Sequence, residues 1–497
     1  MHVKTKTDEF PDYLVDASNL SGGYAEKLFI PQTKKEIAEI LSEANKKGIA
    51  VTVSGARTGT VGGAIPFGGY LISLEKFTKL EVSKDDSGGK AAVGAGVLLT
   101  DVQKAVDAEG LFYPPDPTEW SCQIGGTVAT NASGARSFKY GATRDFVERL
   151  QIVLADGDHL EIKRGEIFSE RGHVEFETAS GKKLRAKLPS YEPPDVRKNT
   201  SGYFSGERID AIDLFIGSEG TLGIVTEVEL NLLPKPKGFL SGIVFFEKEE
   251  DLLELVYEAR SLSFESRLGT GTELIDATVL EYFDSNALEF IREKFPETPK
   301  DMAGAIFFEQ ETTEENEDDL FEKWNALLEN HNAGIEISWF AINEQDLEKM
   351  RDFRHALPVA VNERIVKNKQ KKVGTDMAVP DDKFRSFLSF YKKKLSESGL
   401  DHVIFGHIGD NHLHANIIPG SQEEAIKARH LYGRFVAQAI MLGGTVSAEH
   451  GIGKLKSKYL YVMYGERYLN EMAELKKAFD RKGILGRGNM FDAKFLL

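Results

Sequence analysis

The stretch that most constrains the fold runs from Pro114 to Gly134 and consists mainly of prolines, glycines and small polar residues. Its second half begins with Ile124-Gly-Gly and carries the polar side chains of Thr127, Thr130, Asn131 and Ser133. Small residues let backbone N–H groups approach a ligand, and hydroxyl and amide groups can bind its polar atoms. The stretch therefore predicts a long polar cofactor threaded between two layers of backbone.

A second Gly-rich segment, Ser54 to Gly63, lies between two apolar runs that predict strands at 50–53 and 70–74. Strand, Gly-rich loop and strand suggest a loop that faces a phosphate, although a plain surface turn fits equally well. Its spacing is neither a Walker loop nor G-x-G-x-x-G, which disfavours an ordinary mononucleotide or Rossmann site.

Length and composition narrow the class of protein. A chain of 497 residues exceeds what one hydrophobic core supports, so we expect at least two domains. The formal charge of −16 argues against bulk nucleic-acid binding. Cys122 is the single cysteine, which excludes an internal disulfide framework and favours a cytoplasmic setting.

The N-terminal residues and the distribution of apolar residues indicate whether the chain carries a targeting or membrane segment. Residues 1–16 carry charges where a signal peptide needs an apolar run, and no stretch approaches the roughly 18 apolar residues of a membrane span. We therefore expect no transmembrane segment, while peripheral contact with the inner membrane stays open.

Periodicity predicts the elements of the first half. Thr33 and Glu36 form a capping box for a helix over 33–47 that Gly48 ends, and Thr100 and Gly110 are the expected cap and stop of a second helix. Further strands are expected at 91–93, 151–155, 214–216 and 222–228, with a turn at Asp156-Gly157 and a linker at 233–237.

The second half is poorer in glycine. Helices are expected at 250–262, 318–330 and 345–366, strands at 305–308 and 335–340, and the acidic run 309–319 is interpreted as a solvated helix entry. The predicted domains are 1–236, 237–430 and a C-terminal segment 431–497. The charged segment 161–197 is expected to be a surface insertion or an oligomer contact.

Histidines concentrate near residue 410. The chain has 11 histidines, and four of them are His402, His407, His412 and His414. If 412–418 is a strand, His412, His414 and Asn416 share one face. A second cluster, Ser447-Ala-Glu-His-Gly-Ile-Gly453, adds a carboxylate and an imidazole. Two imidazoles and a carboxylate suit catalytic zinc or another divalent ion, and a buried polar network without metal is the alternative.

Five motifs together resemble the FAD-binding domain of the vanillyl-alcohol oxidase superfamily, in its glycolate oxidase, D-lactate dehydrogenase and D-2-hydroxyglutarate dehydrogenase branch. They are Gly59–Gly63, Pro115-Asp-Pro, Ile124–Gly134, Lys139–Asp145 and Phe215–Val225. The resemblance implies an α+β protein: an FAD-binding domain of two α/β subdomains, followed by a ferredoxin-like α+β substrate domain. The stretch Gly483–Phe491 resembles a terminal motif that returns the chain to the flavin domain.

The same resemblance assigns FAD to particular residues. The 54–63 loop lacks the His or Cys of covalently flavinylated relatives, so non-covalent FAD is expected. The assigned positions are Ser54, Gly55, Arg57, Thr58, Gly59, Gly62, Gly63, Pro115, Asp116, Ile124, Gly125, Gly126, Thr127, Thr130, Asn131, Ser133, Gly134, Tyr140, Gly141, Glu219, Gly223, Ile224 and Asn489.

In the second half, Gly406–Ile418 and Glu449–Gly453 resemble the metal motifs of this branch. Carried over, His407, His414 and Glu449 are metal ligands and His450 is the catalytic base. Zinc is the first expectation, with manganese or iron as alternatives. His412 stands where the family more often has Asn, which makes it a candidate extra ligand.

Substrate recognition follows from the same comparison. Arg354 resembles the family's arginine that binds the substrate carboxylate. We expect Asn416 to be a catalytic residue together with Arg354 and His450. Thr375–Pro380 resembles D-lactate dehydrogenase-like members. The lysine that precedes this strand in hydroxyglutarate-type enzymes has only Lys371 or Lys372 as approximate counterparts.

The sequence thus predicts an FAD- and metal-dependent enzyme that oxidises a D-2-hydroxy acid, such as D-lactate, glycolate or D-2-hydroxyglutarate, to the 2-oxo acid. A quinone, a cytochrome or an electron-transferring flavoprotein is the expected electron acceptor, and a homodimer is an open expectation. The alternatives are a metallohydrolase, which leaves the flavin motifs unexplained, and a flavoprotein electron-transfer or assembly subunit of a larger oxidase complex.

Overall fold

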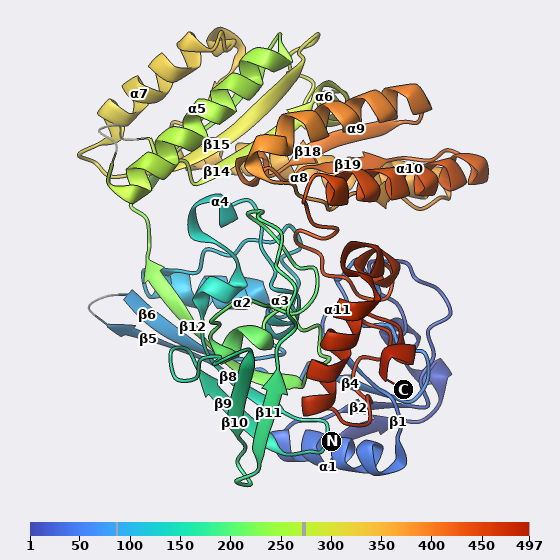
Figure 1. Ribbon diagram of the computed structural model, residues 1–497. Coiled ribbons are helices and arrows are strands. Elements are labelled where there is room, and N and C mark those ends of the chain that lie inside the picture. The colour runs from blue at the N-terminus through green and yellow to red at the C-terminus, as the bar shows by residue number, and fades with distance from the viewer. Residues whose placement is uncertain (86–87, 271–274, 497) are drawn as a thin grey trace.

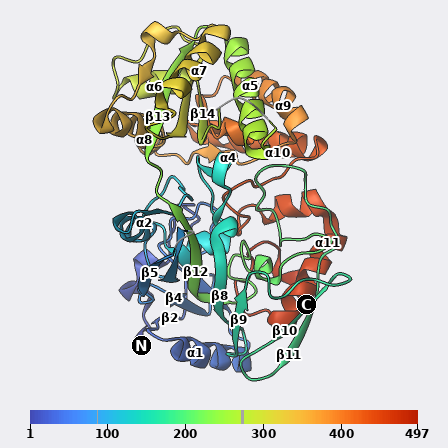
Figure 2. The ribbon, with the colours of Figure 1, turned by 90° about the vertical axis from the view of Figure 1, so that its left-hand side faces the viewer.

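The computed structural model describes residues 1–85, 88–270 and 275–496, and the chain forms two halves (Figure 1). Strands β1 to β12 and helix α11 lie in one half, and the seven-stranded sheet with its helices forms the other. The chain crosses between the halves after β12 and returns after α10 (Figures 1 and 2).

A four-stranded sheet, in the order β1-β2-β4-β3, holds the first Gly-rich loop. Its strands are β1 (His2–Lys4), β2 (Lys27–Ile30), β3 (Val51–Ser54) and β4 (Tyr70–Ser73), with parallel β2/β4 and β3/β4 pairs. Helix α1 (Lys34–Lys47) connects β2 to β3, and the Thr33 hydroxyl caps it by accepting from the Glu36 N–H at 3.2 Å. Left-handed Gly48 ends this helix, so the predicted helix, cap and stop are confirmed.

The second sheet of this half has six strands around the long β12. They are β5 (Leu80–Asp85), β6 (Gly88–Gly94), β7 (Leu111–Phe112), β8 (Val147–Val153), β9 (His159–Lys163) and β12 (Ile224–Pro234). Buried and less buried residues alternate along β12, as expected for a strand with one face on the core. Gly157, with positive φ, makes the predicted turn between β8 and β9.

Two expectations for this half are wrong. Helix α2 (Leu99–Ala108) is capped at Leu98, not at Thr100, because Leu98 pairs with Gln123 in a β-bridge that fixes where the helix can begin. Residues 214–216 are not a strand, since the chain forms a 3₁₀ turn, η4 (Ala211–Leu214), capped by the Asp210 side chain.

The short helices of this half are α3 (Ile124–Thr130) and α4 (Ser137–Tyr140), followed by the 3₁₀ turn η3 (Thr143–Phe146). The hairpin β10 (His173–Glu177) and β11 (Lys183–Lys187) occupies much of the charged 161–197 segment. Phe176 of this hairpin packs edge-on against Phe479, with ring centroids 5.4 Å apart. The segment is therefore a layer over helix α11 (Ser457–Phe479).

The other half is built on a seven-stranded antiparallel sheet in the order β16-β13-β15-β14-β18-β19-β17. The strands are β13 (Gly238–Phe246), β14 (Val279–Asp284), β15 (Gly304–Thr312), β16 (Trp339–Phe340), β17 (Val373–Gly374), β18 (His402–Gly406) and β19 (His414–Ile417).

Helices cover both faces of this sheet, and successive residues of a strand therefore enter different cores. Val244 and Phe246 belong to the core that also includes residues of α5 (Glu249–Leu268), α7 (Glu317–Asn330), α9 (Phe384–Ser398) and α10 (Gln422–Met441). Ile243 and Phe245 pack with α6 (Ser285–Arg292) and α8 (Glu344–Asn368). Burial on both sides explains the continuous apolar runs of β13 and β15.

Three predictions for the second half need correction. Residues 335–340 form a 3₁₀ turn, η5 (Ile335–Ile337), and a two-residue strand, because only Trp339 and Phe340 pair with β13. The acidic run 309–319 begins inside β15, where Glu309 is buried and lies 3.2 Å from Arg136. The predicted boundary at residue 430 falls within the single helix α10, so the return to the first half follows Met441.

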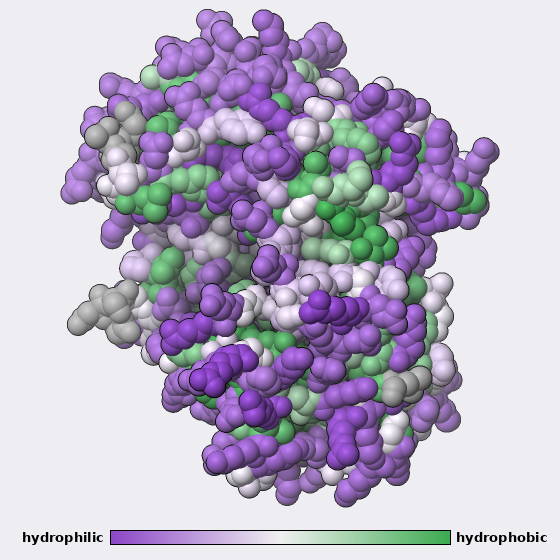
Figure 3. All heavy atoms as spheres, viewed as in Figure 1, coloured by the Kyte–Doolittle hydropathy of each residue, from purple (hydrophilic) through white to green (hydrophobic). Residues whose placement is uncertain are grey.

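None of the helices in the described ranges is long and apolar enough to cross a membrane. Polar residues dominate the face in Figure 3, and that face is hollowed between the halves.

A substitution at Lys476 of α11 tests which interaction holds the C-terminal segment against the first half. The Lys476 side chain is 2% exposed, and its ammonium donates to Asp480 Oδ2 at 2.8 Å and to the carbonyls of Thr221 and Leu485. Lys476→Met leaves the Asp480 carboxylate buried and unpaired, so we expect a loss of about 3–5 kcal/mol in unfolding free energy. Urea unfolding followed by circular dichroism measures it. The neighbouring Lys477→Met is the control, and equal losses would contradict this account.

Candidate active site

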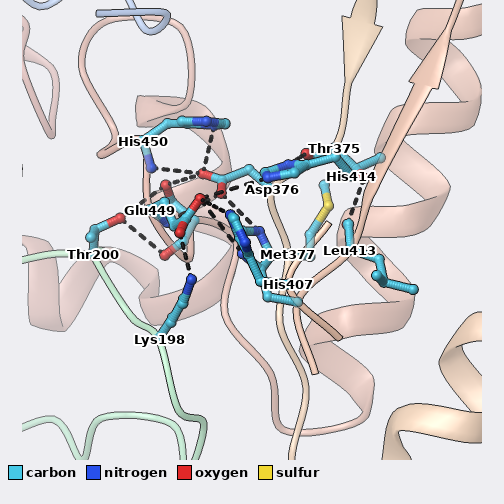
Figure 4. Close-up of polar contacts among 12 residues, drawn as sticks. Lys198, Thr200, Thr375, Asp376, Met377, His407, Leu413, His414, Glu449 and His450 are labelled. Carbon is cyan, nitrogen blue, oxygen red and sulfur yellow. Dashed lines mark hydrogen bonds and ion pairs between the residues drawn. The ribbon is translucent and has the colours of Figure 1, made fainter. Parts of the chain in front are cut away.

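The site is a cluster of histidines and carboxylates at the junction of the two halves (Figure 4). His407 follows β18, His414 begins β19, and Glu449 and His450 lie in the loop between α10 and α11. Ligand atoms of His407, His412, His414 and Glu449 lie within 4.8 Å of one another. The structure thus brings together the three predicted metal ligands and adds His412.

One carboxylate oxygen is the centre of this cluster. Glu449 Oε2 lies 3.2 Å from His407 Nε2, 3.6 Å from His414 Nε2 and 3.8 Å from His412 Nδ1. Burial opposes ionisation of Glu449, but His407 and Lys198 outweigh it and hold its pKa well below the usual range. An ionised carboxylate facing three imidazoles is a donor set suited to a divalent cation.

The second nitrogen of each of these histidines faces an orienting acceptor. His407 Nδ1 lies 2.5 Å from Glu281 Oε1, and His414 Nδ1 lies 3.1 Å from the Thr375 carbonyl oxygen. Burial lowers the pKa of His407, yet Glu281 and Glu449 outweigh it and raise the pKa to about 9. Acceptors behind metal-binding histidines fix the ring and the tautomer.

His412 is 0% exposed, and neither ring nitrogen has a hydrogen-bonding partner within the described ranges. Its Nε2 lies 3.1 Å from Asp376 Oδ1, close but without hydrogen-bond geometry. Burial, followed by the neighbouring His414, lowers its pKa to about 3. A neutral, buried imidazole with free nitrogens is what a metal would satisfy.

Asp376 organises the Glu449 loop. Its Oδ2 accepts from Ser447 Oγ at 2.7 Å, Lys456 Nζ at 2.5 Å and the His450 N–H at 3.1 Å. Its Oδ1 accepts from the Glu449 N–H at 3.1 Å. Burial opposes ionisation of Asp376, but His450 and Lys456 outweigh it and keep its pKa well below the usual range.

His450 differs from the other three histidines. Its Nδ1 lies 3.3 Å from Asp376 Oδ2, and its side chain is 38% exposed. Its ring stacks on His414 with centroids 5.4 Å apart. The imidazole is therefore oriented by a carboxylate yet accessible, as a proton acceptor requires.

Residues from the first half reach the same carboxylate. Ser133 Oγ donates to Glu449 Oε1 at 2.8 Å, and Lys198 Nζ donates to the same oxygen at 2.6 Å and to the Gly134 carbonyl at 3.0 Å. The predicted flavin stretch thus adjoins the predicted metal cluster. Sequence reasoning missed Lys198, because it lies just after the 161–197 segment in a region without a motif.

Arg354, on α8, lies behind His407. Its Nε is 3.4 Å from Glu281 Oε2, and its guanidinium lies 4.0 Å from Asp116, which accepts from the Trp120 indole. Arg354, Asp116 and Trp120 help to line a cavity of about 1310 Å³ between the halves. Glu281, like Lys198, lies outside the motifs, and Asp376 lies in the Thr375–Pro380 stretch but was assigned no role from the sequence.

Charge in this network is unbalanced. In the described part of the chain, ion pairs connect five carboxylates with four cationic groups: Asp116, Glu281, Asp376, Asp410 and Glu449 with Lys198, Arg354, Lys456 and His407, whose pKa is raised to about 9. A further cation would offset the carboxylate in excess, which agrees with the donor set around Glu449.

The first Gly-rich loop is held by the C-terminal segment. Asn489 Nδ2 donates to the carbonyls of Gly63 and Glu219 at 3.1 and 3.2 Å, and Lys454 Nζ donates to Asn489 Oδ1 at 2.7 Å. The Glu219 carboxylate accepts from the N–H groups of Ile452 and Gly453 at 2.6 and 2.7 Å. Glu219 and Asn489 therefore position loops in this structure.

Two glycines have free space beside their backbone, where a cofactor could approach. A Cβ placed on Gly59 or Gly126 would meet no described atom within 4 Å. Gln123 Oε1 is buried without a hydrogen-bonding partner in the described residues and lies 3.1 Å from a Cβ built on Gly55. Exposed glycine backbone and an unsatisfied amide oxygen on facing loops fit a polar cofactor such as FAD.

Other predicted cofactor residues have partners within the protein. Thr127 and Thr130 donate to helix α3 carbonyls, while Asn131 accepts from the Arg144 N–H. Arg57 packs over the Tyr13 ring at 4.5 Å, and Tyr140 donates to Glu311 of the other half.

The remaining positions are mostly packed. Ser54 ends β3 and is buried, Ile224 begins β12 in the core, and Cβ atoms on Gly62, Gly125, Gly134, Gly141 and Gly223 would collide with neighbours. Pro115 precedes Asp116 at the cavity, and Thr58 and Gly63 lie in the open loop.

The fold and the comparisons with known proteins define the class. The family described as FAD binding domain matches residues 25–163, and the family described as FAD linked oxidases, C-terminal domain, matches residues 263–490. Alkyldihydroxyacetonephosphate synthase shares the fold, with a TM-score of 0.67 and 15% identity over 97% of this chain and 82% of that one. The protein is thus an FAD-linked oxidoreductase.

Relatives over nearly the full length identify the family. A D-lactate dehydrogenase of Anaerostipes hadrus is 30% identical, over 96% of this chain and 92% of its own. Glycolate oxidase subunit GlcD of Bacillus subtilis (strain 168) is 28% identical, with coverage of 96% and 92%. D-2-hydroxyglutarate dehydrogenase of Xanthomonas citri pv. viticola is 29% identical, with coverage of 93% and 88%. The chain belongs to the FAD-linked oxidase family, in the branch that includes these relatives.

Gly59→Leu tests the cofactor loop. Because a Cβ at Gly59 meets no described atom, the new side chain leaves the apoprotein fold undisturbed but occupies space that we assign to FAD. We expect at least a tenfold loss of FAD affinity, measured by flavin fluorescence quenching, with an unchanged unfolding midpoint of the apoprotein. Gly433→Leu, on α10 of the other half, where a Cβ also meets no described atom, is the control. Unchanged affinity in Gly59→Leu would place the cofactor elsewhere.

Proposed function

We propose that this FAD-linked oxidoreductase is a metal-dependent dehydrogenase that converts a D-2-hydroxy acid to its 2-oxo acid. The observation that carries the proposal is the convergence of His407, His414, Glu449 and His450 directly beside the flavin stretch, through Ser133. The names of the relatives agree with this substrate class.

FAD and a divalent metal ion would supply two parts of the chemistry. Bound FAD supplies the acceptor for a hydride from C2 of the substrate. A divalent ion held by His407, His414 and Glu449 supplies a Lewis acid that lowers the pKa of the substrate hydroxyl.

The chain itself supplies the base. His450 accepts the hydroxyl proton at Nε2, because Nδ1 faces Asp376 at 3.3 Å and the outer edge of the ring is accessible. Asp376 stabilises the imidazolium that forms, while Lys456 and the Glu449 and His450 N–H groups keep that carboxylate in place. General-base catalysis of this kind contributes about 10²–10⁴-fold.

Arg354 is the proposed carboxylate receptor. Arg354 borders the cavity. It contacts Glu281, which in turn contacts His407, so only Glu281 lies between Arg354 and the predicted metal ligands. A guanidinium can bind a carboxylate with two parallel hydrogen bonds. Asn416 stays a proposed catalytic residue. It lies on β19 near His414, is buried, and its side chain lies against Gly374 of β17.

We favour a substrate with one carboxylate. Lys371 donates to the Asn19 carbonyl, and neither Lys371 nor Lys372 is among the described residues that line the cavity at Arg354. D-lactate and similar short acids are therefore the first candidates, and D-2-hydroxyglutarate and glycolate belong in the test panel. The proposed acceptor is a quinone, a cytochrome or an electron-transferring flavoprotein, in a cytoplasmic setting.

A second candidate function is that of a subunit in a larger oxidase, since one relative is named a subunit of glycolate oxidase. This alternative also predicts bound FAD. It differs in predicting that the isolated chain is not reduced by any hydroxy acid.

An anaerobic absorbance titration tests the proposal. We expect a D-2-hydroxy acid to bleach the oxidised flavin band of the purified protein and its L-enantiomer to leave it unchanged. Prolonged treatment with a chelator should abolish bleaching, and added Mn²⁺, Zn²⁺ or Co²⁺ should restore it. Flavin that no acid in the panel bleaches would favour the subunit alternative, and bleaching that survives complete metal removal would refute metal dependence.

His450→Gln tests the base. The amide keeps a polar side chain but cannot accept the proton, so we expect the rate of flavin reduction to fall about 10²–10⁴-fold. FAD content and metal content should match the wild type. His430→Gln, an exposed histidine of α10, is the control. A reduction rate within threefold of the wild type would assign the base to another residue.

A further inference from the structure

His412 faces Glu449 in the same way as the two predicted histidine ligands do. Each of the three rings presents one nitrogen to Glu449 Oε2, at 3.2, 3.6 and 3.8 Å. Each has an oxygen near its other nitrogen: Glu281 and the Thr375 carbonyl are hydrogen-bonded to His407 and His414, and Asp376 Oδ1 lies 3.1 Å from His412 Nε2 without hydrogen-bond geometry. This is the arrangement by which proteins orient metal-binding imidazoles.

We propose that His412 is a fourth protein ligand of the metal, beside His407, His414 and Glu449. The proposal rests on the proposed function for the presence of a metal. It goes beyond that function by assigning a role to a residue that the hydride transfer does not use.

Separations within the cluster support this assignment. Metal–nitrogen and metal–oxygen bonds of about 2.1 Å place neighbouring ligand atoms about 3.0 Å apart around an octahedral ion and about 3.4 Å apart around a tetrahedral one. The three nitrogen-to-Glu449 distances of 3.2 to 3.8 Å are near these values. A small inward movement of the side chains would complete the coordination.

Burial supplies an independent reason. His412 is 0% exposed, and both its ring nitrogens lack hydrogen bonds to any described residue. Leaving a buried polar nitrogen unsatisfied costs about 1–3 kcal/mol. Of the three histidines that face Glu449, His412 has the most to gain from a metal, because His407 and His414 each already have a hydrogen bond.

The fourth ligand has a consequence for the kind of metal. Four protein donors fill a tetrahedral ion and leave it no open position. An ion of coordination number six keeps two positions, which match the hydroxyl and carboxylate oxygens of a 2-hydroxy acid. A site with His412 therefore favours Mn²⁺, Fe²⁺ or Co²⁺ over tetrahedral Zn²⁺.

X-ray absorption spectroscopy of the metal-stripped protein reloaded with Co²⁺ alone tests the ligand set directly. The multiple-scattering signal of imidazole counts histidine ligands without any substitution. We expect three imidazoles in the wild type and two in His412→Asn. Two imidazoles in the wild type would overturn the proposal.

Affinity gives a second measurement. Competition with a chromogenic chelator should show more than a hundredfold loss of Co²⁺ affinity in His412→Asn. Glu281→Gln, which removes the negative charge behind His407 and beside Arg354 but leaves His412 unchanged, is the matched comparison and should lose about 10–100-fold. Circular dichroism and FAD content establish that each variant is folded. Unchanged affinity in a folded His412→Asn would refute the fourth ligand.

The outcomes separate the two proposals. If the wild type binds Co²⁺ through two imidazoles, metal-dependent dehydrogenation still stands and only the role of His412 is refuted. If the wild type binds no Co²⁺, both the fourth ligand and metal dependence are refuted. Oxidation of a D-2-hydroxy acid is tested separately, by bleaching of the FAD absorbance.

Discussion

The buried carboxylate of Asp376 is the constraint on which the site depends. It is 0% exposed and is held ionised by Lys456 and His450. A buried charge is tolerated only when hydrogen bonds and opposite charges surround it, and here the Glu449 loop provides them with Ser447 Oγ and two backbone N–H groups. The position of Glu449 and His450 is thus fixed by satisfying Asp376, before any ligand binds.

Glu449 extends this constraint across the two halves. Its Oε1 is bound by Ser133 and Lys198 from the first half, and its Oε2 faces histidines from the second. Each half alone would leave buried charge unpaired, because Lys198 needs Glu449 and Asp410 as its partners. Electrostatics therefore orders the halves relative to each other, and the cofactor stretch lies beside the histidine cluster as a result.

Local patterns in the sequence predicted the parts of the fold that depend on local physics. The Thr33 cap, the Gly48 stop and the helix starts near 249, 317 and 344 need only nearby residues. Leu98 and Trp339 are different, since distant β-pairing decides where their elements begin. The site divides in the same way: resemblance to family motifs predicted His407 and Glu449, whereas Lys198 and Glu281 act through tertiary contacts that leave no local pattern.

Asp376 also separates the roles of two neighbouring histidines. Its Oδ1 faces His412, which is fully buried, while its Oδ2 faces His450, which is 38% exposed. The same carboxylate can therefore orient a ring toward Glu449 and another toward the accessible side of the cluster. In the proposed mechanism the exposed ring of His450 exchanges protons with the substrate, and the buried ring of His412 binds the metal. Because Asp376 lies beside both rings, we expect movement of the 375–377 segment to change both proposed functions together.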